Sequence, residues 1–410
     1  MPARRKILWL SHFLPYPPKG GAQIRSYNLI KELSSYHDVH LFCIADKSKL
    51  KAYFSDVDEG AKEAEERLGK YSKRLAIQWL PKRSSMSKYF ILLRSLFLLD
   101  SYSVTLLRDL DVSQLIAFAQ EIDFDFVHLD TVALTPYIKY LSARAINLNH
   151  HNIESDMMFR RAEKEGNPIK SFIFKLDAIK IRRIEKMSAK HLCNHIVCSE
   201  LDKKRLKNIL PSANISTIEN GIDIRKDILD ATETKERKGA LFIGGLDWYP
   251  NADAVSFILS EVWPLVIKEN QSATLDIVGK NPAAELKDLA RKYEGVNLHG
   301  FVDDISYFYG TRKFFICPIR DGGGTKLRIL DAMANFIPVL AHPIAFEGID
   351  ASPEIHYFAA SNAEEFAEQI KRINNLSEDS LKKMMKRAFL LIKEKYDYKE
   401  IGERLANLYS

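Results

Sequence analysis

The sequence predicts an α/β protein that is built from two Rossmann-like domains. Short apolar runs alternate with helical patterns along the chain, which is typical of parallel sheets covered by helices on both faces. The alternation stops at a polar stretch near residue 225 and then starts again. The 410 residues are also enough for two domains, each with a core of its own.

The first domain is predicted over residues 1–225. It opens with an apolar run at 6–12, a turn rich in proline and glycine, and a helical pattern at about 23–34. A strand, a turn and a helix in this order form the start of a parallel α/β unit. Further strands are expected at 39–44, 126–129, 145–148, 195–198 and 215–218.

The second domain is predicted over residues 226–395. It follows a stretch at 225–238 that is polar and has no apolar period, as expected of a linker. The terminal segment, 396–410, contains a last helical pattern that we expect to pack back toward the first domain. Two such domains facing each other predict a cleft between them, a favoured place for a ligand. In the second domain we expect strands at 240–243, 274–278, 296–298, 314–318 and 338–341, and helices at about 252–268, 283–292, 326–334 and 380–395.

The composition is that of an ordinary globular protein, with 46% hydrophobic and 28% charged residues. The four cysteines form no C-x-x-C pair and no zinc-like pattern with histidine, so the sequence predicts a reducing, cytoplasmic environment and no structural metal. The longest apolar stretch, 89–99, contains Arg94 and is too short to span a membrane.

Positive charge is concentrated in the first half of the chain. Residues 1–225 carry 36 basic and 26 acidic side chains, whereas residues 226–410 carry 24 and 28. Two basic and apolar stretches, at 82–108 and 160–190, account for much of this surplus. The stretch at 82–108 predicts either a helix packed on the first domain with solvated charges or a surface that contacts anionic lipid headgroups. The stretch at 160–190 predicts one or two long amphipathic helices.

The sharpest local feature is a triple glycine, Gly322, Gly323 and Gly324, that follows a buried strand and precedes a helix. Glycines let the backbone approach a ligand closely, and the start of a helix favours an anion such as phosphate. Lys326 and Arg328 add positive charge there although it opposes the helix dipole. The alternative interpretation is a simple turn followed by a helix whose charges are solvated.

Several further motifs keep the order and spacing of one enzyme family along nearly the whole chain. They resemble the motifs of family 4 glycosyltransferases, in particular the branch associated with exopolysaccharide assembly. The motifs are Pro17–Gly21 with Arg25, the HNIE segment at 151–154, the VCSELD segment at 197–202, the NGID segment at 220–223, GFVDD at 300–304, the glycine motif at 318–334, PVLA at 338–341 and FEG at 346–348.

This resemblance implies a GT-B fold that binds a nucleotide-sugar in the second domain and an acceptor against the first. It also implies transfer with retention of the anomeric configuration and without a metal or another cofactor. The implied catalytic residues are His151, Lys326 and Arg328. The implied acceptor-side residues are Gly20, Gly21, Arg25, Asn152 and Glu154. The implied donor-binding residues are Gly244, Gly300, Phe301, Val302, Asp321, Gly322, Gly323, Gly324, Thr325, Asp331 and Glu347.

Within this set the resemblance gives some residues separate roles. Asp331 is expected to bind the nucleotide ribose, Arg328 to lie beside the diphosphate, and His151 to lie near the anomeric carbon. The segment 300–302 is expected to form the wall of the nucleobase site. Glu347 matches the acidic residue that follows the PV strand.

Three departures from the family pattern accompany the resemblance. The first acid of the E-x7-E pair would fall at Gly323, with Asp321 two residues away, and the second acid is Asp331 rather than glutamate. No basic residue appears between Gly244 and Lys268, where many members carry one. We therefore expect Lys326 and Arg328 to supply most of the phosphate-binding charge.

We expect a glycosyltransferase that moves a hexose from a nucleotide-sugar to a saccharide or lipid-linked acceptor in surface glycan synthesis, on the inner face of the cytoplasmic membrane. The alternative is an inactive GT-B-like binding subunit that partners an active transferase. A sugar-nucleotide epimerase is a weaker candidate, because the set of motifs favours transfer. An NAD-dependent oxidoreductase is also weaker, since neither the strand at 6–10 nor the strand at 240–243 is followed by G-x-G-x-x-G. No paired carboxylates indicate a glycoside hydrolase, and no module indicates a nucleic-acid partner.

Overall fold

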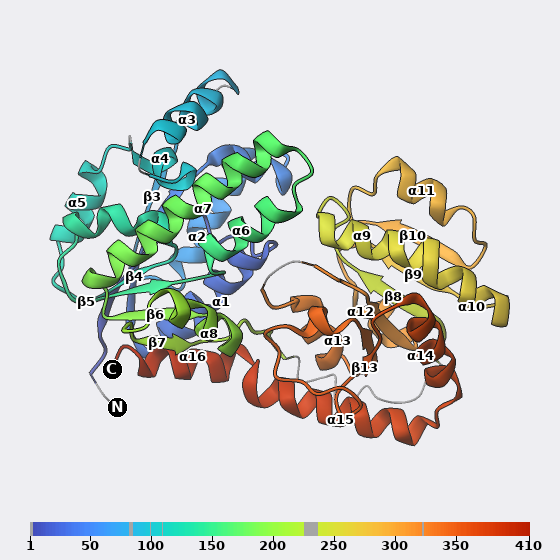
Figure 1. Cartoon of the computed structure of the whole chain (residues 1–410). Coiled ribbons are helices and arrows are strands. Elements are labelled where there is room, and N and C mark those ends of the chain that lie inside the picture. The colour runs from blue at the N-terminus through green and yellow to red at the C-terminus, as the bar shows by residue number, and fades with distance from the viewer. Residues whose placement is uncertain (1–2, 82–84, 99, 109, 225–236, 322–323) are drawn as a thin grey trace. The chain divides into compact units, whose positions relative to one another are not determined.

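The computed structural model describes residues 3–81, 85–98, 100–108, 110–224, 237–321 and 324–410 (Figure 1). The chain divides into two compact units, one of Met1–Glu219 with Tyr398–Ser410 and one of Asn220–Asp397. Each unit contains one parallel sheet with helices, so the predicted two-domain α/β fold is confirmed. The expected boundary at 225 and most of the expected linker lie outside the described residues.

The first unit holds a seven-stranded parallel sheet in the order β3-β2-β1-β4-β5-β6-β7. The strands are β1 (Lys6–Ser11), β2 (Asp38–Ala45), β3 (Arg74–Trp79), β4 (Phe124–Leu129), β5 (Ala143–Asn149), β6 (Asn194–Val197) and β7 (Ile215–Thr217). The helices are α1 (Gly21–Tyr36), α2 (Val57–Gly69), α3 (Ser85–Phe97), α4 (Tyr102–Arg108), α5 (Ser113–Gln120), α6 (Glu154–Lys164), α7 (Pro168–Ser188), α8 (Glu200–Ile209) and α16 (Tyr398–Asn407), with 3-10 turns η1 (Lys47–Ala52), η2 (Val132–Tyr140) and η3 (Ala189–His191).

Strand β1 lies in the middle of this sheet and is buried on both faces. Its side chains alternate, as they must in a strand. Ile7 and Trp9 belong to an apolar cluster with α1, α2 and α16, whereas Leu8 and Leu10 belong to a second cluster with α5, η2 and α7. The continuous apolar run of β1 is therefore the consequence of two covered faces.

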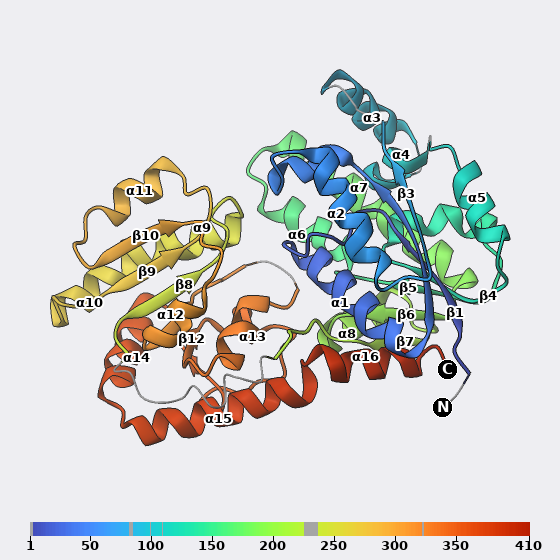
Figure 2. The same ribbon diagram turned by 180° about the vertical axis from the view of Figure 1, so that it is seen from behind.

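The terminal helix α16 completes the first unit by packing on α1. Gly402 allows the close contact, because a Cβ at this position would lie 2.3 Å from Cβ of Glu32. Beyond the helix, Tyr409 is fully buried, and its hydroxyl lies 2.5 Å from Nδ1 of His128. Figure 2 shows α16 running along the helices on this side of the sheet.

The second unit holds a six-stranded parallel sheet in the order β10-β9-β8-β11-β12-β13. The strands are β8 (Ala240–Ile243), β9 (Leu275–Val278), β10 (Val296–Gly300), β11 (Phe314–Cys317), β12 (Val339–Ala341) and β13 (Phe358–Ala359). The helices are α9 (Tyr249–Phe257), α10 (Trp263–Glu269), α11 (Ala284–Ala290), α12 (Ser306–Thr311), α13 (Leu327–Ala334), α14 (Ala363–Asn375) and α15 (Glu378–Lys395), with the 3-10 turn η6 (Pro343–Phe346).

One expected helix is not regular. The stretch predicted as a single helix at 252–268 consists of α9, a π-helical turn at Ile258–Val262 and α10. Pro264 stands in the first turn of α10 and has no N–H to donate to the preceding turn, which explains why the regular hydrogen-bond ladder cannot run through.

Both sheets have the same switch in strand order. In the first unit the chain proceeds from β1 to β2 and β3 and then returns to place β4 on the other side of β1. In the second unit it proceeds from β8 to β9 and β10 and then places β11 beside β8. Open α/β sheets bind ligands at the carboxyl ends of the strands where the order switches. Among the described residues, no helix has the length and apolar character that a membrane crossing requires.

Candidate functional site

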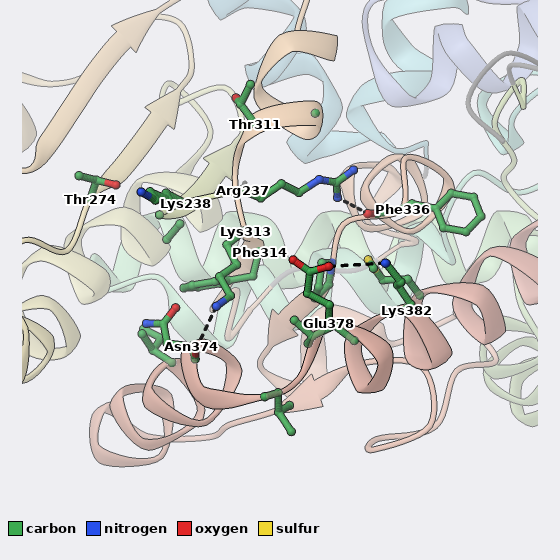
Figure 3. A pocket seen from close by; sticks show the side chains of 18 of the residues that line it. Arg237, Lys238, Thr274, Thr311, Lys313, Phe314, Phe336, Asn374, Glu378 and Lys382 are labelled. Atoms are coloured by element: carbon green, nitrogen blue, oxygen red, sulfur yellow. Dashed lines mark hydrogen bonds and ion pairs between the residues drawn. The ribbon is translucent and has the colours of Figure 1, made fainter. Parts of the chain in front are cut away.

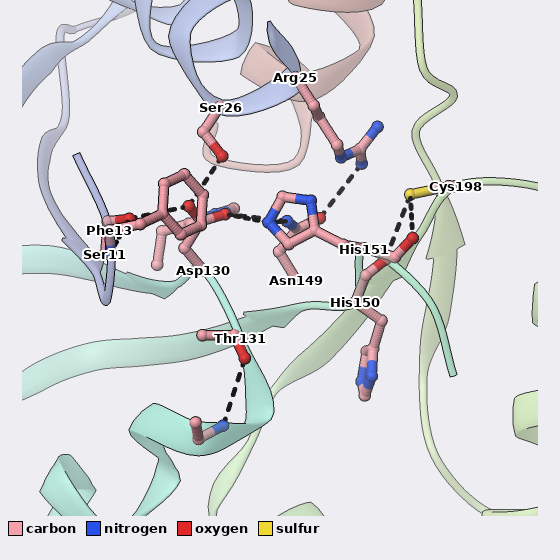
Figure 4. Close-up of polar contacts among 12 residues, drawn as sticks. Ser11, Phe13, Arg25, Ser26, Asp130, Thr131, Asn149, His150, His151 and Cys198 are labelled. Carbon is pink, nitrogen blue, oxygen red and sulfur yellow. Dashed lines mark hydrogen bonds and ion pairs between the residues drawn. The ribbon is translucent and has the colours of Figure 1, made fainter. Parts of the chain in front are cut away.

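A buried carboxylate, Asp130, lies at the switch point of the first unit, directly after β4. Ser26 and Ser11 donate to its Oδ2 at 2.8 and 3.2 Å, and the Asn149 amide donates to its Oδ1 at 3.0 Å. His151 Nε2 lies 3.1 Å from the same Oδ1 (Figure 4). The network therefore joins the ends of β1, β4 and β5 to the first turns of α1.

Asp130 is ionised in this environment. Burial raises its pKa, but the charges of His151 and His128 and their hydrogen bonds outweigh burial and hold the pKa of this carboxyl well below its usual range. An ionised carboxylate only accepts hydrogen bonds, so the contact with His151 requires the proton on Nε2. Nδ1 of the neutral His151 ring is then an acceptor, and it becomes a donor when the ring is protonated.

Arg25, expected on the acceptor side, is buried inside the first unit. Its side chain is only 1% exposed, and it donates to Asn149 Oδ1 at 3.1 Å and to the carbonyl of Glu219 at 2.8 Å. Arg25 thus orients the amide that binds Asp130. Gly20 is the N-cap residue of α1 and Gly21 its first residue, with no side-chain cap between them.

Glu154, at the start of α6, is an acidic residue three positions after His151. It accepts a hydrogen bond of 2.9 Å from the Thr131 hydroxyl. Burial raises its pKa to about 7, and the charges of Glu185 and Asp177 act in the same direction. Glu154 therefore changes its charge near neutral pH, whereas Asn152 simply lies in the connection between β5 and α6.

Histidines beside this network are structural. His150 Nε2 lies 3.0 Å from Nδ1 of His195, and both side chains are buried. Burial lowers the pKa of His195 to about 4 and that of His12 to about 4. These rings are therefore neutral at physiological pH. Two histidines lie beside the buried carboxylate, the fully buried His128 and the partly exposed His151, and His151 is the one of the two that solvent reaches.

In the second unit, the loop after β8 packs tightly. A Cβ on Gly244 would lie 2.8 Å from the Asn251 side chain, and a Cβ on Gly279 would lie 2.0 Å from the carbonyl oxygen of Gly244. The Asn251 amide donates to the Gly245 carbonyl at 2.9 Å. Glycine is therefore required at position 279 for the loops after β8 and β9 to approach each other, whereas a side chain at 244 would displace the Asn251 amide.

Positive charge reaches this loop from neighbouring strands, which the sequence prediction missed. Lys280 follows β9, and its Nζ lies 3.4 Å from Oδ2 of Asp247. Arg320 follows β11, lies 3.1 Å from Asp253 on α9 and covers the Phe257 ring at 4.2 Å. The expectation that Lys326 and Arg328 supply most of the charge is thus incomplete. A basic residue within three positions of a strand end is the sequence signal that could have found both.

The start of helix α13 carries Lys326, Arg328 and Asp331, which the glycine motif predicted, and Arg328 forms a hydrogen bond with Asp331. Lys326 is the N-cap residue, and its Nζ donates to the Gly324 carbonyl at 3.0 Å. Arg328 donates to Asp331 Oδ2 at 2.8 Å. Burial raises the pKa of Asp331, and the charge and hydrogen bond of Arg328 oppose that rise. Arg328 therefore supports the ionised form of Asp331 in addition to any contact with a ligand.

The other predicted donor residues lie on loops of the second unit. Gly300 ends β10 with φ of 70°, a left-handed conformation that favours glycine, and the exposed ring of Phe301 follows it. Val302 packs against the core. Glu347 follows η6, while Asp321, Gly324 and Thr325 flank positions 322 and 323, which lie outside the described residues.

Strand β10, which ends at Gly300, is bound by a buried acid, Asp276 of β9. Its Oδ1 lies 2.5 Å from His299 Nε2, and Arg312 binds its other oxygen. These contacts hold the carboxyl end of β10 against β9 and against Arg312, which follows α12. It had no counterpart in the sequence prediction, because the three residues come from three separate elements.

A large cavity in the second unit is not part of this site. It measures about 1370 Å³ and lies at the amino ends of β8, β9, β11 and β12, opposite the glycine loops (Figure 3). Its wall includes Lys313, which donates to the Asn374 carbonyl at 3.0 Å, and Lys382, which lies 3.5 Å from Glu378. Ligands of open α/β sheets bind at the other end of the strands.

Comparisons with known proteins give a family match for part of the second unit. Residues 237–375 match the family model described as "Glycosyl transferases group 1". The second unit therefore contains a group 1 glycosyltransferase domain. A protein described as an uncharacterized 44.6 kDa protein in the cps region of Klebsiella pneumoniae is 27% identical over 413 residues, and the match covers 97% of each chain.

Solved structures of low sequence identity share the fold over almost the whole chain. Sucrose-phosphate synthase from Thermosynechococcus elongatus matches with a TM-score of 0.69, 14% identity and coverage of 99% and 98% of the two chains. TarM matches with a TM-score of 0.66, 15% identity and coverage of 100% and 99%. Anabaena HepE, solved with UDP and glucose, matches with a TM-score of 0.62, 14% identity and 99% coverage of each chain. The chain thus has a GT-B type fold.

Proposed function

We propose that this protein is a retaining, family 4 type glycosyltransferase that moves a hexose from a nucleotide-sugar to a saccharide or lipid-linked acceptor in surface polysaccharide synthesis. The observation that carries the proposal is the group 1 glycosyltransferase domain, in which the basic side chains of Lys280 and Arg320 follow β9 and β11 at the switch point. HepE has been solved with UDP-glucose, and the Klebsiella relative lies in a cps region. Both support a nucleotide-sugar donor and a polysaccharide product.

The donor is proposed to bind to the second unit. Its diphosphate would lie on the glycine loops after β8 and β11, with Lys280, Arg320 and Lys326 as the neighbouring cations. Asp331 would accept hydrogen bonds from the ribose hydroxyls, and the segment 300–302 would contact the nucleobase. Arg328 donates to Asp331 and opposes the rise that burial causes in the pKa of that carboxyl.

In the proposed reaction, the bond between the anomeric carbon and the diphosphate oxygen breaks, and the nucleoside diphosphate leaves with the electron pair. The acceptor hydroxyl forms the new bond to that carbon, and its proton passes to the released diphosphate. Negative charge grows on the diphosphate in the transition state, so fixed cations nearby stabilise it. We propose that these side chains and the start of α13 perform this task without a bound metal.

His151 is proposed to face the transferred sugar from the first unit. Asp130 fixes the tautomer of His151, which leaves Nδ1 as the ring atom available to a ligand. A sugar hydroxyl can donate to this nitrogen. The acceptor would bind on the same unit, near Gly20, Gly21 and the start of α6. We propose that the protein works in the cytoplasm, at the inner face of the membrane.

The binding subunit that the sequence left as an alternative is not favoured. Two departures from the family pattern motivate this alternative: the missing acid at position 323 and the lack of a basic residue soon after Gly245. Lys280 and Arg320, which follow β9 and β11, supply positive charge in this part of the unit. The missing acid at position 323 concerns a residue outside the described ones.

A donor screen tests the proposal. The purified chain is incubated with a panel of nucleotide-sugars and a glycan acceptor, and mass spectrometry follows the release of nucleoside diphosphate. We expect turnover with one donor, an anomeric configuration in the product that matches the donor, and no loss of rate with EDTA. If UDP, GDP and ADP all fail to raise the melting temperature at millimolar concentrations, the proposal is wrong.

A further inference from the structure

Helix α3 carries its apolar stripe on the outside. Met86, Phe90, Leu93 and Phe97 follow each other at spacings of four, three and four residues, so they share one helix face. This face is turned to solvent, with Met86 80%, Phe90 73% and Phe97 89% exposed. A helix in a soluble domain normally buries such a stripe, and both views draw α3 at the outer edge of its unit (Figures 1 and 2).

Helix α7 exposes a second set of apolar side chains among basic ones. Ile169, Phe172, Ile179 and Met187 are exposed and fall on one side of the helix by their spacing. Lys175, Arg183 and Lys186 are exposed on the same side. Of the ten large exposed apolar side chains among the described residues of the first unit, eight lie on α3 and α7. Two helices thus hold most of the exposed apolar surface of this unit.

Acidic side chains are missing from this surface. The sequence of α3 contains none. The two acids of α7 are turned inward, since Glu185 is buried against Ser155 and Asp177 accepts a hydrogen bond of 2.8 Å from the Tyr102 backbone. The exposed charged side chains of α7 are therefore all positive, and Asp177 is half-buried.

The two helices are fixed to each other. Lys180 of α7 is buried, and its ammonium group donates to the carbonyls of Ser95 and, at 3.3 Å, Leu96 near the end of α3. Asp177, one turn earlier, holds the segment that follows α3. These contacts connect α7 to the end of α3 and to the start of α4 within the same unit.

We propose that this α3–α7 surface docks on an anionic lipid bilayer, with its apolar side chains inserted among the headgroups. Large exposed apolar patches mark interaction sites, and a helix that combines exposed aromatic and aliphatic residues with lysine and arginine lies in the membrane interface. A protein partner fits less well, because lysine is depleted in protein interfaces. The charge and the apolar side chains act together on a membrane, since headgroups attract the cations while the acyl boundary accepts the rings.

Vesicle sedimentation with the full chain, without donor or acceptor, tests this proposal. Vesicles of phosphatidylcholine with 30 mol% phosphatidylglycerol are compared with phosphatidylcholine alone, in the ~30% anionic range that makes the surface potential appreciable. We expect binding to the anionic vesicles only. Replacing Lys175, Arg183 and Lys186 with glutamine should weaken it on the order of 100-fold. Phe90→Ser with Phe97→Ser, or Phe172→Ser with Ile179→Ser, should weaken it about tenfold or more.

Matched variants elsewhere control for general effects. Lys287, Lys292 and Lys383 are exposed lysines of the second unit, and Ile355 and Leu390 are exposed apolar residues there. Their replacement by glutamine and serine should leave vesicle binding unchanged, and thermal melting verifies that every variant is folded.

Three results would overturn the proposal. The first is equal binding to both kinds of vesicle or to neither, and the second is unchanged binding by the α3 and α7 variants. The third is a change from dimer to monomer in these variants with no vesicle binding, which would make the surface a contact between copies of the chain. None of these outcomes depends on transferase activity, so they are distinct from a failure of the proposed function.

Discussion

Nε2 of His151 lies 3.1 Å from Oδ1 of Asp130, so a histidine that follows β5 is oriented by a buried carboxylate that follows β4. This relationship predicts that Asp130 determines which ring nitrogen of His151 carries the proton. Asp130→Asn removes the ionised acceptor, and the His151 ring is then free to carry its proton on Nδ1, away from the orientation the proposed reaction needs. We expect kcat to fall on the order of 100-fold with little change in the Kd for the nucleotide.

Ser26→Ala is the matched control for Asp130→Asn. It removes one hydrogen bond to Asp130 Oδ2 but keeps the acceptor for His151. It should cost about 1 kcal/mol of unfolding free energy and leave kcat within a few-fold. Equal loss of kcat in both variants would mean that Asp130 has only a structural role.

Asp331 is predicted to recognise the ribose. The wild type should bind the ribonucleoside diphosphate more tightly than its 2′,3′-dideoxy form, by about 1 kcal/mol or more for each hydrogen bond lost. Asp331→Ala should bind both forms equally and weakly, while Asp331→Asn should keep part of the preference. Isothermal titration with the two nucleotides measures this ratio, and a preference unchanged in Asp331→Ala would refute the assignment.

Substitutions of Lys280 and of Asp247 are predicted to have opposite effects on donor binding. Lys280→Ala removes a cation beside the loop after β8 and should weaken nucleoside diphosphate binding by about 1.5–3 kcal/mol, the value of a hydrogen bond to a charged group. Asp247→Asn releases Lys280 from its 3.4 Å ion pair and should keep or tighten binding. Lys268→Ala, on α10, is the control. Titration at two salt concentrations separates the Lys280 effect, which should shrink as salt rises.

The raised pKa of Glu154 predicts that the stability of the first unit depends on pH. Its pKa is about 7 in the folded protein against an ordinary value of 4.5, so the unfolded chain releases this proton first. Folding is then favoured by the protonated form, and stability is lost as the pH rises from about 4.5 to about 7. Glu154→Gln should remove this loss, which is on the order of 1–3 kcal/mol.

Urea unfolding between pH 5 and pH 8 tests the Glu154 prediction. The stability of Glu154→Gln relative to the wild type should increase with pH over this range and stay constant above it. Glu163→Gln on the same helix replaces an exposed acid and should show no such trend. A constant difference between Glu154→Gln and the wild type would contradict the prediction.

The close contact at Gly402 predicts that packing of the terminal helix α16 on α1 contributes to the stability of the first unit. A Cβ at position 402 would lie 2.3 Å from Cβ of Glu32, so Gly402→Val should separate α16 from α1 and lower the unfolding free energy by about 1–3 kcal/mol. Gly310→Ala, where a Cβ meets nothing within 4 Å, is the control. Thermal melting compares the two variants, and equal melting temperatures would count against this packing.

Local patterns in the sequence were enough to predict most elements of the two sheets. Strands buried on both faces read as continuous apolar runs, so β1 and β8 were predicted within one or two residues. Strand β3 was missed because its side chains are mostly half-buried and show no such run. Strand β13 has only two residues, too few for any period to appear.

The sequence by itself determined the α/β class and the places of His151 after a strand and of Lys326, Arg328 and Asp331 at the start of a helix, because these depend on short-range periodicity and turn chemistry. The roles of these residues came from the family resemblance. Only the tertiary structure decided which of them have partners. Strand order brings Asp130 to His151 and Lys280 to the loop after β8, and packing buries Arg25. Strand order follows from contacts between residues far apart in the chain, so no local pattern could contain it.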